Sequence, residues 1–385
     1  MTNRHRRRFV QLGFAILCLM VTDTAVGLDH VTLKRDGSTI KIEGRVLVTA
    51  QDGGLLLEGR DGVLWTAQPD DLVEHTCDDQ PFVPLTKDEM KARLLAELPP
   101  GFDVHETAHY LICYDTSRAY AQWCGSLFER LYRAFTNTWK GKGFELSEPE
   151  FPLTAIVFAS RASYIRFSQP ELGAAAKSIF GHFSLRTNRM VMFDLTGIEQ
   201  YGSGGRPRGT ATQINLILSQ PDAARNVSTI VHEATHQIGF NCGLHARYSD
   251  CPVWFAEGIA MYCETPDLSR SRGWRGIGSV NLNRLEQFVR YFRSRPSNSL
   301  RTLIVDDKRF RDPKVSLDAY AEAWSLTYFL IRQRPKQFVG FMKTLREKGP
   351  LLRDDPETRL KEFESAFGDI GQLDVDFIRY MRRLR

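Results

Sequence analysis

A His-Glu-x-x-His motif stands twice in this 385-residue chain, at His105–His109 and at His232–His236. On an α-helix this spacing places both imidazoles on one face, where they can bind a single metal ion. On a β-strand the two imidazoles would be roughly 13 Å apart, too far to share one ion. The local structure around each copy therefore decides whether the chain has a metal site and where that site lies.

The later copy lies within an apolar pattern that is typical of a helix. Apolar side chains recur there at helical spacing, at Ile230, Val231, Ala234 and Ile238. Asn226 or Ser228 can cap the start of this helix, and Gly239 suits the left-handed residue that closes one. We therefore predict a helix that carries His232 and His236 on one face.

The earlier copy leads into an aromatic and β-branched run, Tyr110–Tyr114, which turn-forming residues follow. This pattern predicts a strand over Val104–Tyr114, and on a strand the motif cannot bind one ion. Asp103 and Glu106 also fit a capping box, so a helical alternative stays open. We favour the strand, and with it a chance origin for the first motif.

A metal site of this kind needs a third protein ligand, and a glutamate follows each copy. Small residues flank Glu257 in Trp254–Tyr262, so its helix can approach the motif helix closely. Glu129 instead has bulky neighbours and an arginine four residues later, the pattern of a solvated ion pair. Catalytic Zn²⁺ sites have three protein ligands and water in the fourth position. We therefore predict a Zn²⁺ site formed by His232, His236 and Glu257.

The paired segments 232–236 and 254–258 resemble those of the gluzincin metallopeptidases, in particular the secreted bacterial peptidase-MA-like proteins. The resemblance extends from about residue 101 to the C-terminus, with weaker similarity at Gly181–Asp194 and Tyr320–Trp324. It implies an α+β, zincin-like catalytic domain with a mixed sheet, a motif helix and a helical C-terminal part. It also implies a hydrolase that cleaves peptide bonds with a metal-activated water.

The resemblance also implies roles for individual residues. His232, His236 and Glu257 would be the zinc ligands, and Glu233 the general base. In the resembled group a Tyr or His from the downstream region often stabilises the oxyanion of the transition state. Tyr320 is our candidate, and His245 and Tyr262 are the alternatives. Tyr320 also shares a helix face with Trp324 and Tyr328, which is the usual pattern of core packing.

Two positions depart from the family pattern. Many gluzincins have an acidic residue four positions after the ligand glutamate, where it orients a ligand histidine, but this chain has Met261. Glu264 and Asp250 are the candidates for that supporting role. Cys242 stands where the metzincin pattern has a third histidine. We expect it to form a disulfide with Cys251, although buried reduced thiols are the alternative.

The N-terminus has the pattern of a signal peptide. A basic segment, Asn3–Arg8, precedes the apolar stretch Phe9–Val21 and the small residues Ala25–Gly27. The stretch is too short for a membrane span, so we expect an exported chain with no stable membrane insertion. Removal of residues 1–27 takes away four arginines and one aspartate, which lowers the formal charge from +5 to +2. This balance gives no reason to expect nucleic acid or an anionic membrane as a partner.

The pattern divides the mature chain into two parts. Short apolar runs alternate with glycine turns over residues 28–80, which predicts a small antiparallel β domain. This β unit is either a docking module for an unknown partner or a packed appendage, and Asp78–Pro84 has the composition of a linker. Residues 85–385 are the expected metallopeptidase domain, helical from about residue 276. Within it, a predicted hairpin precedes the motif helix, and Tyr201–Gly209 is a candidate lid loop.

We predict an exported, zinc-dependent peptidase that acts on a peptide or protein substrate. The alternatives are a non-catalytic envelope binding or scaffold protein with a structural or vestigial zinc site, and a zinc amidase that acts on cell-wall crosslinks. The intact Glu233 favours catalysis, because a purely structural site needs no base at that position. The sequence names neither the substrate nor the cleavage preference.

Overall fold

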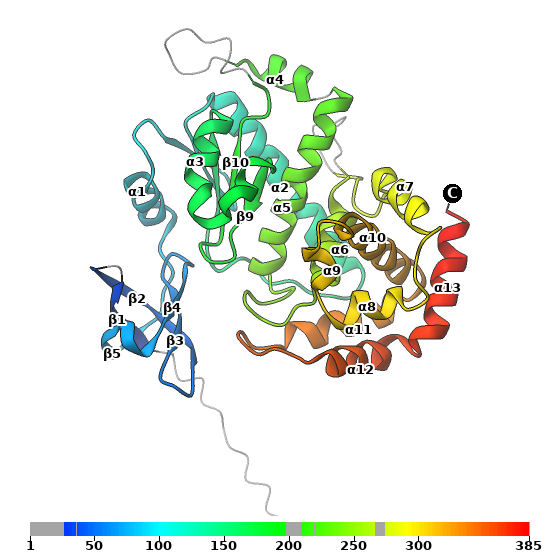
Figure 1. Cartoon of the computed structure of the whole chain (residues 1–385). Helices are drawn as coiled ribbons and strands as arrows, with labels where there is room; N and C mark the ends of the chain where they lie inside the picture. The colour runs from blue at the N-terminus through cyan, green and yellow to red at the C-terminus, as the bar shows by residue number, and fades with distance from the viewer. Residues whose placement is uncertain (1–26, 36, 198–208, 219, 266–273, 385) are drawn as a thin grey trace, which may run out of the picture.

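The computed structural model describes residues 27–35, 37–197, 209–218, 220–265 and 274–384. Residues 1–26 of the expected signal peptide and residues 201–208 of the candidate lid loop lie outside these residues. The fold is mixed α+β, with an N-terminal β unit and a helical C-terminal part, as the sequence predicted (Figure 1). None of the described helices is long and apolar enough to cross a bilayer.

The N-terminal β unit is one antiparallel sheet with the strand order β4-β3-β2-β1-β5. Its strands are β1 Gly27–Arg35, β2 Ser38–Thr49, β3 Leu55–Gly59, β4 Leu64–Ala67 and β5 Leu72–Pro81. Alternate apolar residues such as Val31, Leu33 and Leu57 form its small core. β5 pairs with β1 as far as Pro81, opposite Gly27. The segment predicted as a linker from Asp78 is therefore mostly strand.

The second sheet has the order β6-β7-β8-β10-β9. Its strands are β6 Asp103–Glu106, β7 Tyr110–Tyr114, β8 Leu153–Phe158, β9 Gly181–Phe183 and β10 Arg189–Phe193. The three central strands are parallel, and both edge strands run antiparallel to their neighbours. Helices cover both faces, so β7 and β8 are apolar at nearly every position. β9 and β10 form the predicted hairpin, with Asn188 in the left-handed region at φ 61°.

Helices pack on the two faces of this sheet and make up the C-terminal part. Met90 and Leu94 of α1 pack on one face, together with Tyr164 of α3, while α2 and α5 pack on the other. The bounds are α1 Lys87–Glu97, α2 Arg118–Gly141, α3 Arg161–Leu172, α4 Ala211–Leu218 and α5 Pro221–Asn241. A 3₁₀ turn, Gly173–Lys177, follows α3, and another, Pro69–Asp71, precedes β5.

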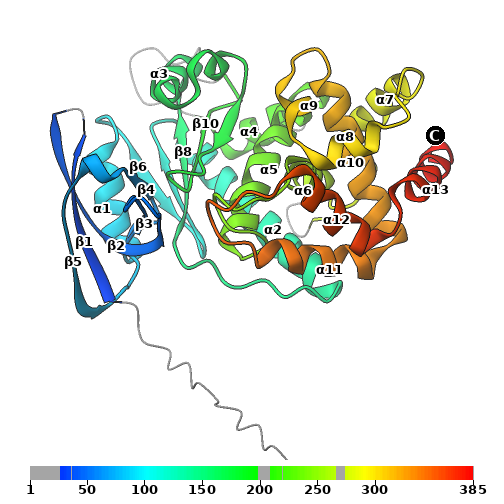
Figure 2. The ribbon, with the colours of Figure 1, turned by 60° about the horizontal axis from the view of Figure 1, so that its bottom comes forward.

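α10 lies at the centre of the C-terminal part and packs against α6, α7, α9, α11 and α13. The bounds are α6 Val253–Cys263, α7 Leu282–Tyr291, α8 Ser299–Val305, α9 Lys308–Arg311, α10 Ser316–Gln333, α11 Pro335–Arg346, α12 Pro356–Phe367 and α13 Ile370–Arg382. In Figure 2 these helices lie on the opposite side of the mixed sheet from the β unit. The fold thus places α5 between the sheet and the helical part.

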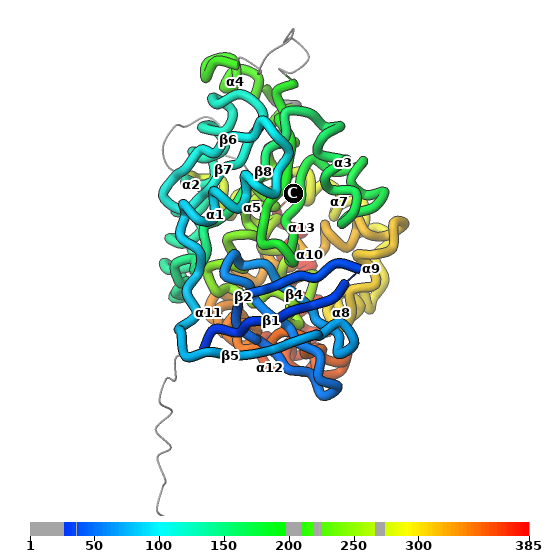
Figure 3. Tube along the Cα trace, turned by 90° about the vertical axis from the view of Figure 1, so that its left-hand side faces the viewer, coloured from blue at the N-terminus to red at the C-terminus, as the bar shows by residue number. Residues whose placement is uncertain are grey.

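The β unit packs directly against the rest of the chain (Figure 3). Glu58 of β3 forms a buried ion pair at 2.6 Å with Arg247. Arg247 lies between α5 and α6. The backbone N–H of Leu64 donates to the carbonyl oxygen of Arg186, beside the β9–β10 hairpin, at 2.7 Å. The unit is therefore a packed part of the molecule, in contact with segments that border the predicted zinc site.

Candidate metal centre

α5 carries the later His-Glu-x-x-His motif and is longer than the sequence predicted. It begins at Pro221, whose missing N–H suits the first turn of a helix, and not near Asn226 or Ser228. It ends at Asn241, beyond Gly239, and the left-handed residue is Gly243 at φ 72°. The extra turns follow because the apolar stripe packs along the sheet and α2, and this packing outweighs local capping signals.

α6 supplies Glu257 and lies close to α10 because its residue 258 has no side chain. A Cβ at Gly258 would lie 2.0 Å from Oγ1 of Thr327 on α10. Gly258, the residue after Glu257, therefore allows the close contact between α6 and α10. α6 also packs against α5, and this second contact directs Glu257 towards the motif histidines.

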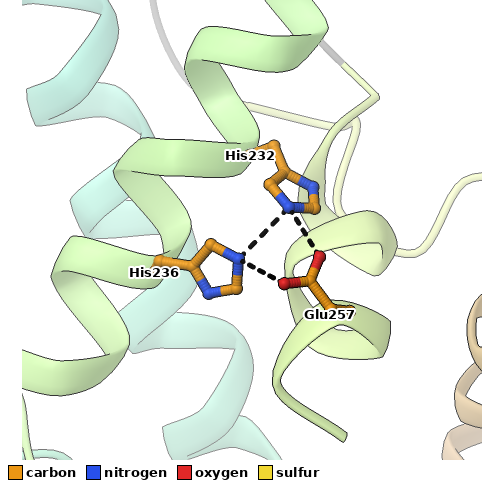
Figure 4. A group of neighbouring side chains, drawn as sticks. All are labelled: His232, His236 and Glu257. Carbon is orange, nitrogen blue, oxygen red and sulfur yellow. Dashed lines mark hydrogen bonds and ion pairs between the residues drawn. The ribbon is translucent and has the colours of Figure 1, made fainter. Parts of the chain in front are cut away.

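His232, His236 and Glu257 converge on one point (Figure 4). Nε2 of His232 lies 3.0 Å from Oε2 of Glu257 and 3.2 Å from Nε2 of His236. Nε2 of His236 lies 3.5 Å from Oε1 of Glu257. Ligand atoms that surround one tetrahedral Zn²⁺ at about 2.0–2.1 Å are roughly 3.3 Å apart. Both the donor atoms and their separations therefore fit a zinc ion.

A further carboxylate orients His232. Oε2 of Glu264 lies 2.8 Å from Nδ1 of His232, which leaves Nε2 directed at the site. The other oxygen of Glu264 accepts hydrogen bonds from Asn281 at 2.6 Å and from Arg284 at 3.1 Å. Glu264 therefore takes the supporting role that Met261 cannot. Asp250, the other candidate, instead pairs with Arg359.

Glu233 lies beside the three candidate ligands, on the wall of the same pocket of about 520 Å³. The backbone N–H of Phe183 on β9 donates to its Oε2 at 2.9 Å. Burial raises the pKa of the Glu233 carboxyl, although the nearby histidines oppose this shift. This arrangement holds one oxygen of the carboxylate beside the candidate ligands, and the raised pKa suits a group that takes up a proton during a reaction.

Tyr320 of α10 lines the same pocket as the candidate ligands. Burial and the charge of Glu257 raise the pKa of its phenol, so the hydroxyl keeps its proton and can donate it. The two alternatives do not line this pocket. His245 is buried beside the ring of Phe240, with a centroid distance of 4.1 Å, and Tyr262 packs on Tyr328.

The earlier motif forms a hairpin, with His105 on β6 and His109 in the turn before β7. The predicted continuous strand is interrupted because Glu129 stabilises this turn. Its Oε1 accepts from the backbone N–H of His109 at 2.7 Å and from Oγ1 of Thr107 at 2.8 Å. Glu129 is buried, so its predicted solvated ion pair with Arg133 is wrong. Within the described residues, the motif at 105–109 belongs to no group with metal-ligand geometry.

The expected disulfide between Cys242 and Cys251 is not formed, and all six described cysteines are free thiols. The two side chains face different surroundings. Cys242 lies beside the hydroxyl of Tyr132 on α2, whereas Cys251 lines the pocket that holds the candidate ligands. Burial raises the pKa of the Cys242 thiol to about 12, which disfavours the thiolate that metal binding requires.

Sequence reasoning did not identify several residues that surround the site. Arg284 and Asn281 support Glu264, and the N–H of Phe183 supports Glu233. Spacing supports only Glu264, which was already a candidate, because it follows Glu257 by seven residues, or two helical turns. Arg284 and Asn281 come from a distant turn and helix, so no local pattern connects them with the motif.

Residues 226–352 match a family model described as a protein of unknown function, DUF1570. The matched segment covers about a third of the chain and contains all three candidate ligands, Glu233 and Tyr320. A search of curated proteins gives no match. The function of this family is unknown, so the match assigns no activity to the chain.

Proposed function

We propose that this protein is an exported, zinc-dependent peptidase of the gluzincin type. The observation that carries the proposal is the convergence of His232, His236 and Glu257 within 4.8 Å, with Glu233 on the same pocket wall. A structural zinc site has four protein ligands and needs no adjacent carboxylate. Three ligands, an open pocket and a half-buried glutamate instead favour hydrolysis.

Each residue has a role in the proposed reaction. His232, His236 and Glu257 would hold Zn²⁺, which when bound polarises the substrate carbonyl and activates water. Glu233 accepts the proton of the attacking water and delivers it to the leaving amine. The hydroxyl of Tyr320 donates a hydrogen bond to the oxyanion that develops on the substrate.

The hairpin beside the pocket supports a peptide substrate in particular. β9 is an edge strand, and its Phe183 lines the pocket that contains Glu233. An extended peptide can pair with an edge strand through backbone hydrogen bonds, which are independent of side-chain identity. Such pairing would present successive peptide groups to Glu233. The apolar Leu185 and Phe240 on the pocket wall would contact the substrate side chains.

The first test combines metal analysis with a peptide-library digest of the mature chain. We expect about one Zn²⁺ per chain, and cleavage products that disappear when a chelator removes the metal. His232→Ala should lose both the metal and the cleavage, while His105→Ala should keep both. Retention of zinc by His232→Ala, or its loss from His105→Ala, would contradict the assignment.

A further inference from the structure

Two arginines from separate segments line the pocket that contains the candidate ligands. Arg311 is the last residue of α9, and Arg353 lies in the chain between α11 and α12. Both are exposed, and neither forms an ion pair or a side-chain hydrogen bond with any residue that the structure describes. α9 lies on the helical side of the molecule, across from the sheet that ends in β9 (Figure 1).

The carboxylates on this pocket wall already have partners. Glu264 pairs with Arg284 at 3.1 Å, and Asp307 pairs with Arg359 at 3.2 Å. Glu257 and Glu233 belong to the metal centre described above. No carboxylate of the described pocket wall is therefore available to neutralise the two arginines, and a bound Zn²⁺ would add further positive charge.

We propose that Arg311 and Arg353 form a subsite that binds a carboxylate of the substrate. The inference rests on the proposed function and specifies its substrate class, peptides with an acidic group near the cleaved bond. The guanidinium of arginine presents parallel N–H donors that match the two oxygens of a carboxylate. That carboxylate is supplied either by a Glu or Asp side chain or by the free C-terminus of the peptide.

The other pocket residues suit this substrate class. Phe183, Leu185 and Val253 form apolar parts of the wall, and they lower the polarity around a bound side chain. The two arginines are exposed, so salt screens their attraction to a carboxylate. The basic pair also attracts an acidic peptide during its approach, which increases the association rate at low salt.

Binding to an inactive variant tests the subsite independently of catalysis. The zinc-loaded Glu233→Gln mature protein is titrated against three fluorescently labelled, alanine-rich heptapeptides. The first has two Glu residues and an amidated end, the second has Gln at both positions and an amidated end, and the third has Gln and a free C-terminus. We expect one of the two carboxylate peptides to bind about tenfold more tightly than the neutral peptide, with the difference decreasing as salt is added. The peptide that binds more tightly shows whether a side chain or the free C-terminus supplies the carboxylate.

Substitution of the two arginines provides the matched comparison. Arg311→Gln together with Arg353→Gln should reduce the preference to less than about twofold, because two exposed cations contribute most of it. Arg293→Gln is the control, since Arg293 is an exposed arginine that does not line this pocket. Equal binding of all three peptides, no measurable binding, or a preference that survives the double substitution would overturn the subsite. The wild type could also cleave no peptide while the inactive variant still prefers a carboxylate peptide. That result would overturn the proposed peptidase activity and support the subsite.

Discussion

His232 has polar neighbours on both of its ring nitrogens. Glu264 lies at Nδ1 at 2.8 Å, and Glu257 lies at Nε2 at 3.0 Å. A carboxylate at Nδ1 fixes the ring orientation and the tautomer, and it makes Nε2 a better metal ligand. Glu264 is itself held by Asn281 and Arg284, so the orientation of His232 depends on α7 and on the segment between α6 and α7.

Glu264→Gln should weaken zinc binding without removing a ligand. The amide cannot supply the negative charge that His232 contacts, and loss of such supporting carboxylates weakens metal binding about 10- to 100-fold. Competition with a fluorescent zinc chelator measures the change. Asp250→Asn is the control, because Asp250 contacts Arg359 and not a candidate ligand. An unchanged zinc affinity in Glu264→Gln would contradict this role.

His245 is buried with no hydrogen-bond partner on either ring nitrogen among the described residues. Burial, together with the charge of His236, lowers the pKa of its imidazole to about 3. The native state therefore leaves His245 neutral at pH values where the unfolded chain, with a pKa near 6.5, binds a proton. This difference destabilises the native state as the pH falls below about 6.5.

His245→Phe should make the protein less sensitive to acid. The free energy of unfolding is measured with a chelator present. Between about pH 6.5 and pH 4.5 it should fall more steeply in the wild type than in the variant. His245 should account for about 1.4 kcal/mol per pH unit of this difference. Urea unfolding at several pH values measures both slopes. Equal slopes for the two proteins would show that His245 binds its proton equally in both states.

The central residues of the site were predictable from spacing, and the peripheral ones were not. His232, His236 and Glu257 lie on two consecutive helices, so a short stretch of sequence contains the whole set. Arg311 and Arg353 belong to segments that only the packing of α9 and α12 brings to the pocket. The residue pattern of one segment cannot predict such a contact, because the contact depends on how distant segments pack together.

At the scale of elements, α6 must fit between α5 and α10. A Cβ at Gly258 would lie 2.0 Å from Oγ1 of Thr327 and 3.1 Å from the carbonyl oxygen of Ala323, both on α10. Part of that contact is backbone, so a rotamer change alone cannot relieve it. The position of Glu257, the preceding residue, therefore depends on close packing between α6 and α10.

Gly258→Ala should destabilise the protein even though alanine favours helices. The overlap with α10 should lower the free energy of unfolding by about 1–3 kcal/mol and displace Glu257 enough to weaken zinc binding. Gly340→Ala on α11 is the matched control, because a Cβ there meets nothing within 4 Å. That change should stabilise the protein by about 0.5–1 kcal/mol. Urea unfolding compares the two variants, and a stable Gly258→Ala with normal zinc affinity would contradict the packing argument.

Long periodic elements were predicted well, and short ones were missed. The apolar spacing over residues 230–238 predicted the motif helix α5, although not its ends. α8 and α9 have only seven and four residues, too few for a helical period to be distinct. The hairpin at β6 and β7 was predicted as one strand, because the partner that stabilises its turn, Glu129, lies on a different element.

At the scale of the whole molecule, the β unit contacts the connection between the two ligand helices. Glu58 and Arg247 are 9% and 8% exposed, and they form an ion pair at 2.6 Å. The neighbours of Arg247, Ala246 and Tyr248, line the pocket with the candidate ligands. We infer that the β unit supports one wall of that pocket, although it supplies no candidate ligand.

Glu58→Gln should test this support directly. It removes the charge that pairs with both the buried Arg247 and the half-buried Arg45, which should lower the free energy of unfolding by about 2–3 kcal/mol. Glu286→Gln is the control, because Glu286 pairs with Arg290 on α7 while their side chains are 69% and 60% exposed, and such pairs contribute about 0–1 kcal/mol. Urea unfolding of both zinc-free variants measures the difference. Equal losses would show that the buried contact adds no stability beyond that of a surface pair.

The central claim is that Glu233 performs acid–base catalysis beside a metal that it does not bind. Glu233→Gln should therefore keep about one Zn²⁺ per chain and the stability of the wild type, because the amide can still accept the hydrogen bond from Phe183. It should hydrolyse a peptide substrate about 10² to 10⁴ times more slowly, since the amide cannot take up a proton. The decisive measurement is kcat of the zinc-loaded variant on the best peptide of the library digest. A zinc-loaded Glu233→Gln that cleaves this peptide as fast as the wild type would contradict the account.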